Sequence, residues 1–175
     1  LTAGGVFSFL LAWELMTLAT AALVATEHEH APARRAAFLY LAMSHVGTGC
    51  LIGGFLALGS MTGSLSFATL LSGGDALPLA RTGLFALFFL GFGVKAGIIP
   101  LHVWLPEAHP AAPSSISALM SAVLVTAGVY GLFRFCAFGL GVPEVSWALA
   151  FLALGALSAL LGVLYALTQT DLKRL

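Results

Sequence analysis

The sequence predicts an all-α membrane protein: a polytopic bundle of about five transmembrane helices, the third of them broken near Pro100. Two observations predict this class. Of the 175 residues, 60% are hydrophobic and 8% are charged, whereas soluble domains carry about 25% charged residues. The apolar residues form runs of about 20, the length that crosses a bilayer as a helix. These runs do not alternate in polarity, as the strands of a membrane barrel do.

The apolar runs define the expected helices of one transmembrane domain over residues 1–175. They cover residues 2–26, 36–58, 82–104, 114–138 and 145–168. Polar, glycine-rich or proline-rich connections separate them, over residues 27–35, 59–81, 105–113 and 139–144. Within the longest connection, residues 65–71 are expected to form a short interfacial helix. Because the chain begins with leucine and ends on a polar segment, we expect a fragment of a longer chain.

Basic residues near the helix ends predict the orientation. If all five runs span, these residues fall on two sides: Arg34, Arg35, Lys173 and Arg174 on one, Arg81 and Arg134 on the other. Short inner loops are enriched in lysine and arginine, so the first side is expected to be cytoplasmic.

Composition also excludes several functions. The net charge is zero, and no basic patch is present to hold phosphates, so no nucleic-acid partner is expected. Cys50 and Cys136 each lie in an apolar run without a second ligand at a useful spacing, so no metal site is expected. No phosphate loop or dinucleotide-binding motif is present. We therefore expect no cofactor, metal or redox centre in this chain.

Glu14 and Lys95 are charged side chains near the middle of predicted spans. A charge at that depth costs about 2.5–3.5 kcal/mol, so each is expected to face protein and to be the other's counter-charge. A buried amine beside a carboxylate holds a proton and releases it when the carboxylate is neutralised or moved. Because intramembrane ionisable residues mark ion routes, the pair is a candidate proton site. The alternative is an ion pair that only sets helix packing.

Histidines extend this candidate path. Lys95, His102 and His109 are spaced seven apart, so Lys95 and His102 would share a face of a continuous helix. Pro100 interrupts that helix, and broken helices at membrane depth line cavities or lie within protein. Since histidine titrates near neutral pH, a hydrated proton path toward the cytoplasm is expected. For His109 the alternative is a turn-capping role. His45 is either a relay residue or a packing contact between helices.

The stretch of residues 95–134, KAGIIPLHVWLPEAHPAAPSSISALMSAVLVTAGVYGLFR, carries a family resemblance. Together with AWELMTL at 12–18 and TQTDLKRL at the end, it resembles the antiporter-like, proton-translocating membrane subunits. These occur in respiratory complex I, in membrane-bound hydrogenases including formate hydrogenlyase, and in multisubunit cation/proton antiporters. The segments SSISALMS and SHVGTG are most similar to the hydrogenase type.

The resemblance implies that this chain is the fifth to ninth of about fourteen helices, in the cytoplasmic membrane of a prokaryote. Glu14 matches the family's helix-five glutamate and Lys95 the lysine of its broken helix seven, a pair that drives proton transfer. The implied function is a proton-translocating, non-redox subunit of an oxidoreductase complex, with redox chemistry in partner subunits. The alternatives are a subunit of a sodium/proton antiporter, moving sodium as well as protons, or a structural membrane subunit that does not pump.

One position departs from the family pattern. Many members carry a lysine where this chain has Thr126, before the Gly-x-Tyr of the eighth helix. The resemblance therefore implies one of two outcomes. Either water together with Ser121 and Thr126 bridges the gap left by the missing lysine, or this copy pumps poorly or not at all.

Overall fold

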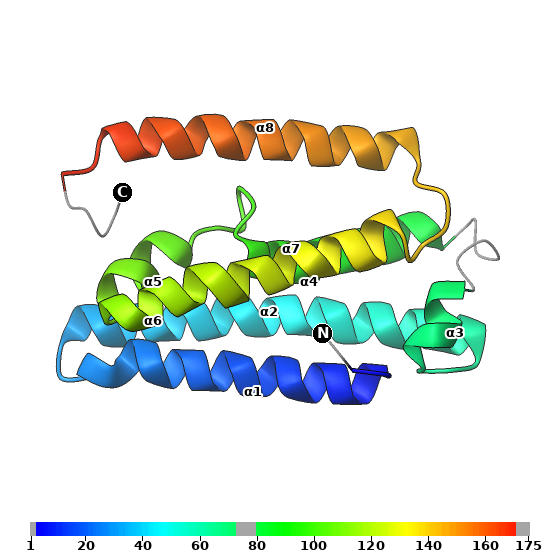
Figure 1. Ribbon diagram of the computed structural model, residues 1–175, viewed down its shortest axis with the longest axis horizontal. Helices are drawn as coiled ribbons and strands as arrows, with labels where there is room; N and C mark the ends of the chain where they lie inside the picture. Colours follow the sequence, from blue (N-terminus) through cyan, green and yellow to red (C-terminus); the bar gives the residue numbers. More distant parts are fainter. Residues whose placement is uncertain (1–2, 73–79, 171–175) are drawn as a thin grey trace.

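The computed structural model describes residues 3–72 and 80–170 and is a helical bundle without strands in those residues (Figure 1). This confirms the all-α class. The helices in chain order are α1 (Val6–Val24), η1 (Ala25–Glu27), α2 (Ala31–Thr62), α3 (Phe67–Ser72), α4 (Arg81–Ala96), α5 (Leu105–Ala111), α6 (Ser114–Leu119), η3 (Met120–Val125), α7 (Thr126–Gly131), η4 (Leu132–Ala137) and α8 (Val145–Leu167). The predicted cytoplasmic residues Lys173 and Arg174 lie outside the described residues.

Four helices in the described part of the chain are long and apolar enough to cross a membrane: Val6–Glu27, Ala31–Thr62, Ser114–Ala137 and Val145–Leu167. The protein is therefore a multi-pass integral membrane protein. The helix over 114–137 joins α6, η3, α7 and η4, and η3 and η4 are π-helical. The remaining predicted run, 82–104, is split. Its helical part, α4, has 16 residues. Separately, α3 lies in the connection where a short helix was predicted over residues 65–71.

The break in the third run lies at Gly97, three residues before Pro100. Gly97 has φ of 73°, a left-handed conformation that glycine adopts without steric cost and that ends helices. Its N–H donates to the carbonyl oxygen of Gly93 at 2.9 Å. The indole Nε1 of Trp104 donates to the carbonyl oxygen of Val94 at 2.7 Å. These donors satisfy carbonyls that the interrupted helix leaves free, which is what allows a broken helix within the bundle.

The core consists of two clusters that meet beside Lys95. α2 packs against both α1 and α4 (Figure 1). Toward α3 the core is aromatic and contains Phe9, Trp13, Phe55, Phe67, Phe88, Phe92 and Phe135, with ring centroids as close as 4.9 Å. The second cluster surrounds Tyr40 and Trp104, whose ring centroids are 5.1 Å apart. Close packing of large rings holds the surrounding helices in register.

α8 lies apart from the other helices (Figure 1). Trp147, its one buried residue, stacks on Phe85 with centroids 4.6 Å apart and planes 7° apart. Further along, the N–H of Ile99 donates to Ser158 Oγ at 3.1 Å. The rest of α8 is apolar and largely exposed, as expected for a surface that faces lipid or other helices.

Candidate functional site

Lys95 is enclosed by three hydroxyl groups. Its side chain is 1% exposed, and its ammonium donates to Thr17 Oγ1 at 2.7 Å, Tyr40 OH at 2.9 Å and Ser44 Oγ at 3.2 Å. A lysine ammonium has three N–H donors and no acceptor, so the three oxygens satisfy it completely. We call Thr17, Tyr40 and Ser44 the hydroxyl cage.

Aromatic rings complete the surroundings of the amine. Lys95 Nζ lies 4.7 Å from the ring centroid of Tyr40 and 5.7 Å from that of Trp13. Both distances lie within the range in which an aromatic face attracts a cation. The hydroxyl oxygens accept from the amine and the aromatic faces attract it when it is charged, at a position that is almost fully enclosed by protein.

The helices supply the cage through their periodicity. Tyr40 and Ser44 are four residues apart on α2, so they lie on the same face, and Thr17 projects from α1. Thr17 also donates to the carbonyl oxygen of Trp13 at 2.9 Å. That bond turns its lone pairs toward Lys95. The amine therefore lies where α1, α2 and the end of α4 meet.

Glu14 makes no direct contact with Lys95 in the described residues, although the two groups are close enough to interact electrostatically. Its Oε2 lies 3.5 Å from Nε2 of His45, and the Glu14 and His45 side chains are 29% and 54% exposed. The reason is geometric: Thr17, nearly one turn further along α1, occupies the position beside the amine. His45 Nδ1 lies 2.8 Å from the carbonyl oxygen of Leu41. The structure thus joins two of the predicted relay residues, Glu14 and His45, next to the cage and at the bundle surface.

His102 and His109 line a second feature, a groove of about 1120 Å³ that also includes Ser121, Arg35 and Glu107. His109 Nδ1 lies 2.9 Å from Ser117 Oγ. His102 Nδ1 and His109 Nε2 are buried, with no hydrogen-bond partner in the described part of the chain. Burial lowers the pKa of His109, which favours its neutral ring. Because α4 ends at Ala96, the spacing of seven does not place Lys95 and His102 on one helix face.

Ser121 and Thr126, the two candidate bridging residues, face different spaces. Ser121 lines the groove with the histidines, whereas Thr126 lines a separate apolar groove beside α1. The two hydroxyls therefore line different grooves, although they are only five residues apart on one continuous span. The structure does not bring them together.

Sequence reasoning missed Thr17 and Tyr40. A signal was present, since Tyr40, Ser44 and Thr48 recur every fourth residue on α2 and form a polar stripe on an otherwise apolar span. Such a stripe indicates a face turned toward protein rather than lipid. Which charged group the stripe faces depends on how α4 packs against α2, and no local pattern contains that information.

We predict that Tyr40→Phe weakens the fold. The ring that contacts the ammonium remains, but the amine loses one of three acceptors, which is expected to lower the free energy of unfolding by about 1–3 kcal/mol. Unfolding of the full-length protein in detergent measures the change. The control is Tyr165→Phe on α8, where the side chain is 61% exposed and a change within about 0.5 kcal/mol is expected. Equal effects of the two substitutions would contradict this assignment.

Comparison with known proteins places the chain in a family. Residues 3–175 match the family described as NADH:quinone oxidoreductase/Mrp antiporter, TM. The chain belongs to this family. Membership confirms the resemblance carried by residues 95–134 and by the AWELMTL segment. The family comprises membrane proteins, in agreement with the spans seen in the structure.

Relatives within the family come from several kinds of complex. The chain is 47% identical over 173 residues to an uncharacterized protein of Mycobacterium tuberculosis, covering 99% of this chain and 27% of that protein. It is 43% identical over 172 residues to hydrogenase-4 component B of Escherichia coli, covering 97% and 25%. Its fold matches a chain of the membrane-bound sulfane sulfur reductase, an archaeal respiratory membrane complex, with a TM-score of 0.87, 27% identity and coverage of 98% and 36%. The chain thus spans about a quarter of the length of these first two relatives.

Proposed function

We propose that this chain is the proton-carrying part of an antiporter-like membrane subunit in a redox-driven complex of the hydrogenase or NADH:quinone oxidoreductase type. The single observation that carries the proposal is Lys95, a fully enclosed amine held by three hydroxyls. A buried charge adds little net stability to helix packing, because the desolvation of the cation offsets its attractions. Ionisable groups kept at such depth serve ion movement.

Proton transfer at this site would use the carboxylate beside the cage. Glu14 belongs to the same helix as Thr17 and approaches His45 at 3.5 Å. When the carboxylate is ionised, it stabilises the charged amine. When it takes up a proton, from His45 or from water, that support is lost and the amine releases its own proton. The hydroxyls of the cage accept and donate, so they conduct the proton without moving far.

The groove beside α5 supplies the route away from the membrane centre. Buried polar atoms require hydrogen-bond partners, and His102 Nδ1 and His109 Nε2 lack them among the described residues. A groove of about 1120 Å³ holds many waters at roughly 30 Å³ each. Water in the groove would supply the missing hydrogen bonds of both imidazole rings and connect them to Arg35 and Glu107 at the groove wall. Neutral histidines in such a chain accept and pass protons.

The proposal includes partners and a location. The Glu14–His45 pair is half-exposed, and a bare carboxylate in hydrocarbon is costly, so another helix of the full-length protein or of a neighbouring membrane subunit covers it. The redox chemistry resides in partner subunits. The complex lies in the cytoplasmic membrane of a prokaryote, with Arg34 and Arg35 on the cytoplasmic side.

The test uses the full-length protein in vesicles across which a potassium diffusion potential is imposed, with internal pH followed by a dye. Glu14→Gln is expected to slow proton transfer by about tenfold, the effect of a change of about 1.4 kcal/mol in proton affinity. The control is Glu144→Gln, an exposed carboxylate before α8, which is expected to leave transfer unchanged. Equal rates in the wild type and the Glu14→Gln variant would refute the proposed relay.

The same vesicles separate the alternatives. A sodium/proton antiporter would move sodium against protons, so a sodium-sensitive dye would respond in step with the pH signal. A structural subunit would show no proton transfer in any variant. Proton transfer without sodium movement is the result expected here.

A further inference from the structure

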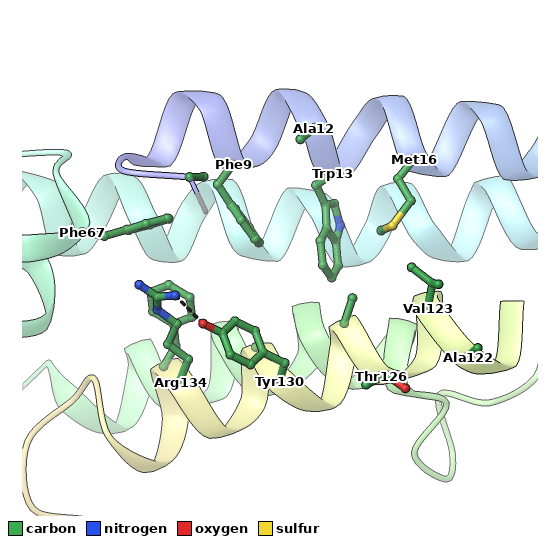
Figure 2. Close-up of a pocket in the computed structure, with 14 residues that line it drawn as sticks. Phe9, Ala12, Trp13, Met16, Phe67, Ala122, Val123, Thr126, Tyr130 and Arg134 are labelled. Atoms are coloured by element: carbon green, nitrogen blue, oxygen red, sulfur yellow. Dashed lines mark hydrogen bonds between the residues drawn. The ribbon is translucent and has the colours of Figure 1, made fainter. Parts of the chain in front are cut away.

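A second groove, separate from the one that His102 and His109 line, lies between α1 and the helix over 114–137 (Figure 2). Its volume is about 430 Å³. Figure 2 shows Phe9, Trp13 and Met16 pointing from α1 toward the facing helix, from which Val123 points back. Thr126 and Tyr130 also line the groove. The α1 residues that line it recur at helical spacing, and so do those of the facing helix. The groove therefore follows both helices lengthwise.

The groove is apolar along its length and cationic at one end. Arg134 is the only charged residue among its described lining residues. It donates to Tyr130 OH, and its guanidinium lies 5.7 Å from the ring centroid of Phe67. No carboxylate lies within 4.0 Å of it among residues 3–72 and 80–170. Arg134 is three residues from the end of its span, Ser114–Ala137, which places the guanidinium near the membrane surface.

The length of the groove matches one hydrocarbon chain. Val123 and Arg134 are eleven residues apart, about 17 Å along a helix. Half of the hydrocarbon core of a bilayer is about 15 Å thick, so the groove runs from the membrane surface to the midplane.

We propose that this groove binds one acyl chain of an anionic phospholipid, whose phosphate is held by Arg134 and the hydroxyl of Tyr130. Arginine binds phosphate through paired, charge-assisted hydrogen bonds. Charge complementarity selects an anionic lipid over a zwitterionic one, because the lining residues that the structure describes offer a cation and no carboxylate to receive a headgroup amine. The acyl chain extends past Tyr130 and Thr126 toward Met16 and Val123.

The bound chain would seal the apolar side of the cage. Trp13 lines the groove, and its ring also lies 5.7 Å from the Lys95 ammonium. A lipid chain packed on the groove side of Trp13 keeps water out of the groove and holds the ring in place. The lipid site does not depend on proton transfer and stands if the proposed function fails.

The experiment is native mass spectrometry of the full-length protein in detergent, titrated with phosphatidylglycerol or phosphatidylcholine bearing identical acyl chains. We expect the wild type to retain phosphatidylglycerol more strongly. Arg134→Gln is expected to weaken phosphatidylglycerol retention by about tenfold, to the level of phosphatidylcholine. Arg134→Lys keeps the charge and is expected to keep the preference. An unchanged preference in the Arg134→Gln protein would overturn the assignment.

Filling the groove tests the acyl-chain site separately. Ala12 is an exposed lining residue on α1, so Ala12→Phe is expected to reduce the retention of both lipids. Ala122→Phe is a second filling variant on the facing helix. Ala156→Phe, on the exposed surface of α8, is the matched control and should leave retention unchanged. If another helix covers the groove in the full-length protein, the filling variants will retain lipid as the control does, and the proposal is overturned.

Discussion

Lys95→Met in the full-length protein is expected to reduce proton transfer by about a hundredfold or more, the effect of removing a positioned acid–base group. Methionine fills nearly the same volume but cannot carry a proton. Thr17, Tyr40 and Ser44 would then lose the donor that satisfies them. Proton movement into vesicles under an imposed potential measures the first effect. Assembly with partner subunits is expected to persist, because the helices around Lys95 are also held by the aromatic clusters.

Lys95→Arg distinguishes proton transfer from a structural charge. Arginine keeps a positive charge in the cage but stays protonated in proteins, so transfer is expected to be lost while the protein remains folded. If the charge only sets helix packing, Lys95→Arg would preserve transfer and Lys95→Met would lose assembly as well as transfer. Normal transfer in the Lys95→Met protein would remove Lys95 from the ion route altogether.

Gly128→Ala is expected to lower the free energy of unfolding by about 1–3 kcal/mol or more, as overpacking does in a close-packed core. A Cβ atom at residue 128 would lie 2.5 Å from the backbone nitrogen of Ala96 and 2.9 Å from the carbonyl carbon of Lys95. Both are backbone atoms at the end of α4, so they cannot rotate away. α7 would have to move from α4, which would displace Lys95 from the cage. Thermal unfolding of the full-length protein and proton transfer in vesicles measure the two effects.

The matched control is Gly155→Ala on α8, where no atom lies within 4 Å of the new Cβ. Alanine is a better helix former than glycine by about 0.5–1 kcal/mol, so this variant is expected to be neutral or slightly more stable. A Gly128→Ala protein as stable as the Gly155→Ala protein would show that α4 and α7 tolerate separation.

Much of the fold could be predicted from the sequence, because membrane helices follow from local composition. A helix that crosses lipid forms its backbone hydrogen bonds within itself, so each apolar run can be predicted as a helix on its own. Four of the five predicted runs contain spans within the described residues. The third run was predicted to break near Pro100, and α4 ends close by, at Ala96 with Gly97 as its C-cap. Proline is a strong general signal for a break, but the left-handed conformation of Gly97 is set by how Trp104 and α5 fold back on α4.

The candidate site was only partly predictable. Glu14, His45 and Lys95 stand out because ionisable groups are rare in apolar spans. The sequence could not show that Glu14 meets His45 instead of Lys95. A carboxylate and an amine on separate helices attract each other in any arrangement, but which hydroxyl comes between them depends on helix rotation and crossing.

By itself the sequence determined that this protein lies in a membrane, that its spans are helical and that it carries ionisable groups within them. Its motifs also placed it in the antiporter family. These properties depend on residue types and spacing along one helix. Only the tertiary structure decided the hydroxyl cage, the separate grooves that Ser121 and Thr126 line, and the apolar groove that ends at Arg134. Those features arise from contacts between helices. Rotating one helix about its axis by one residue, about 100°, would give each of its side chains different neighbours.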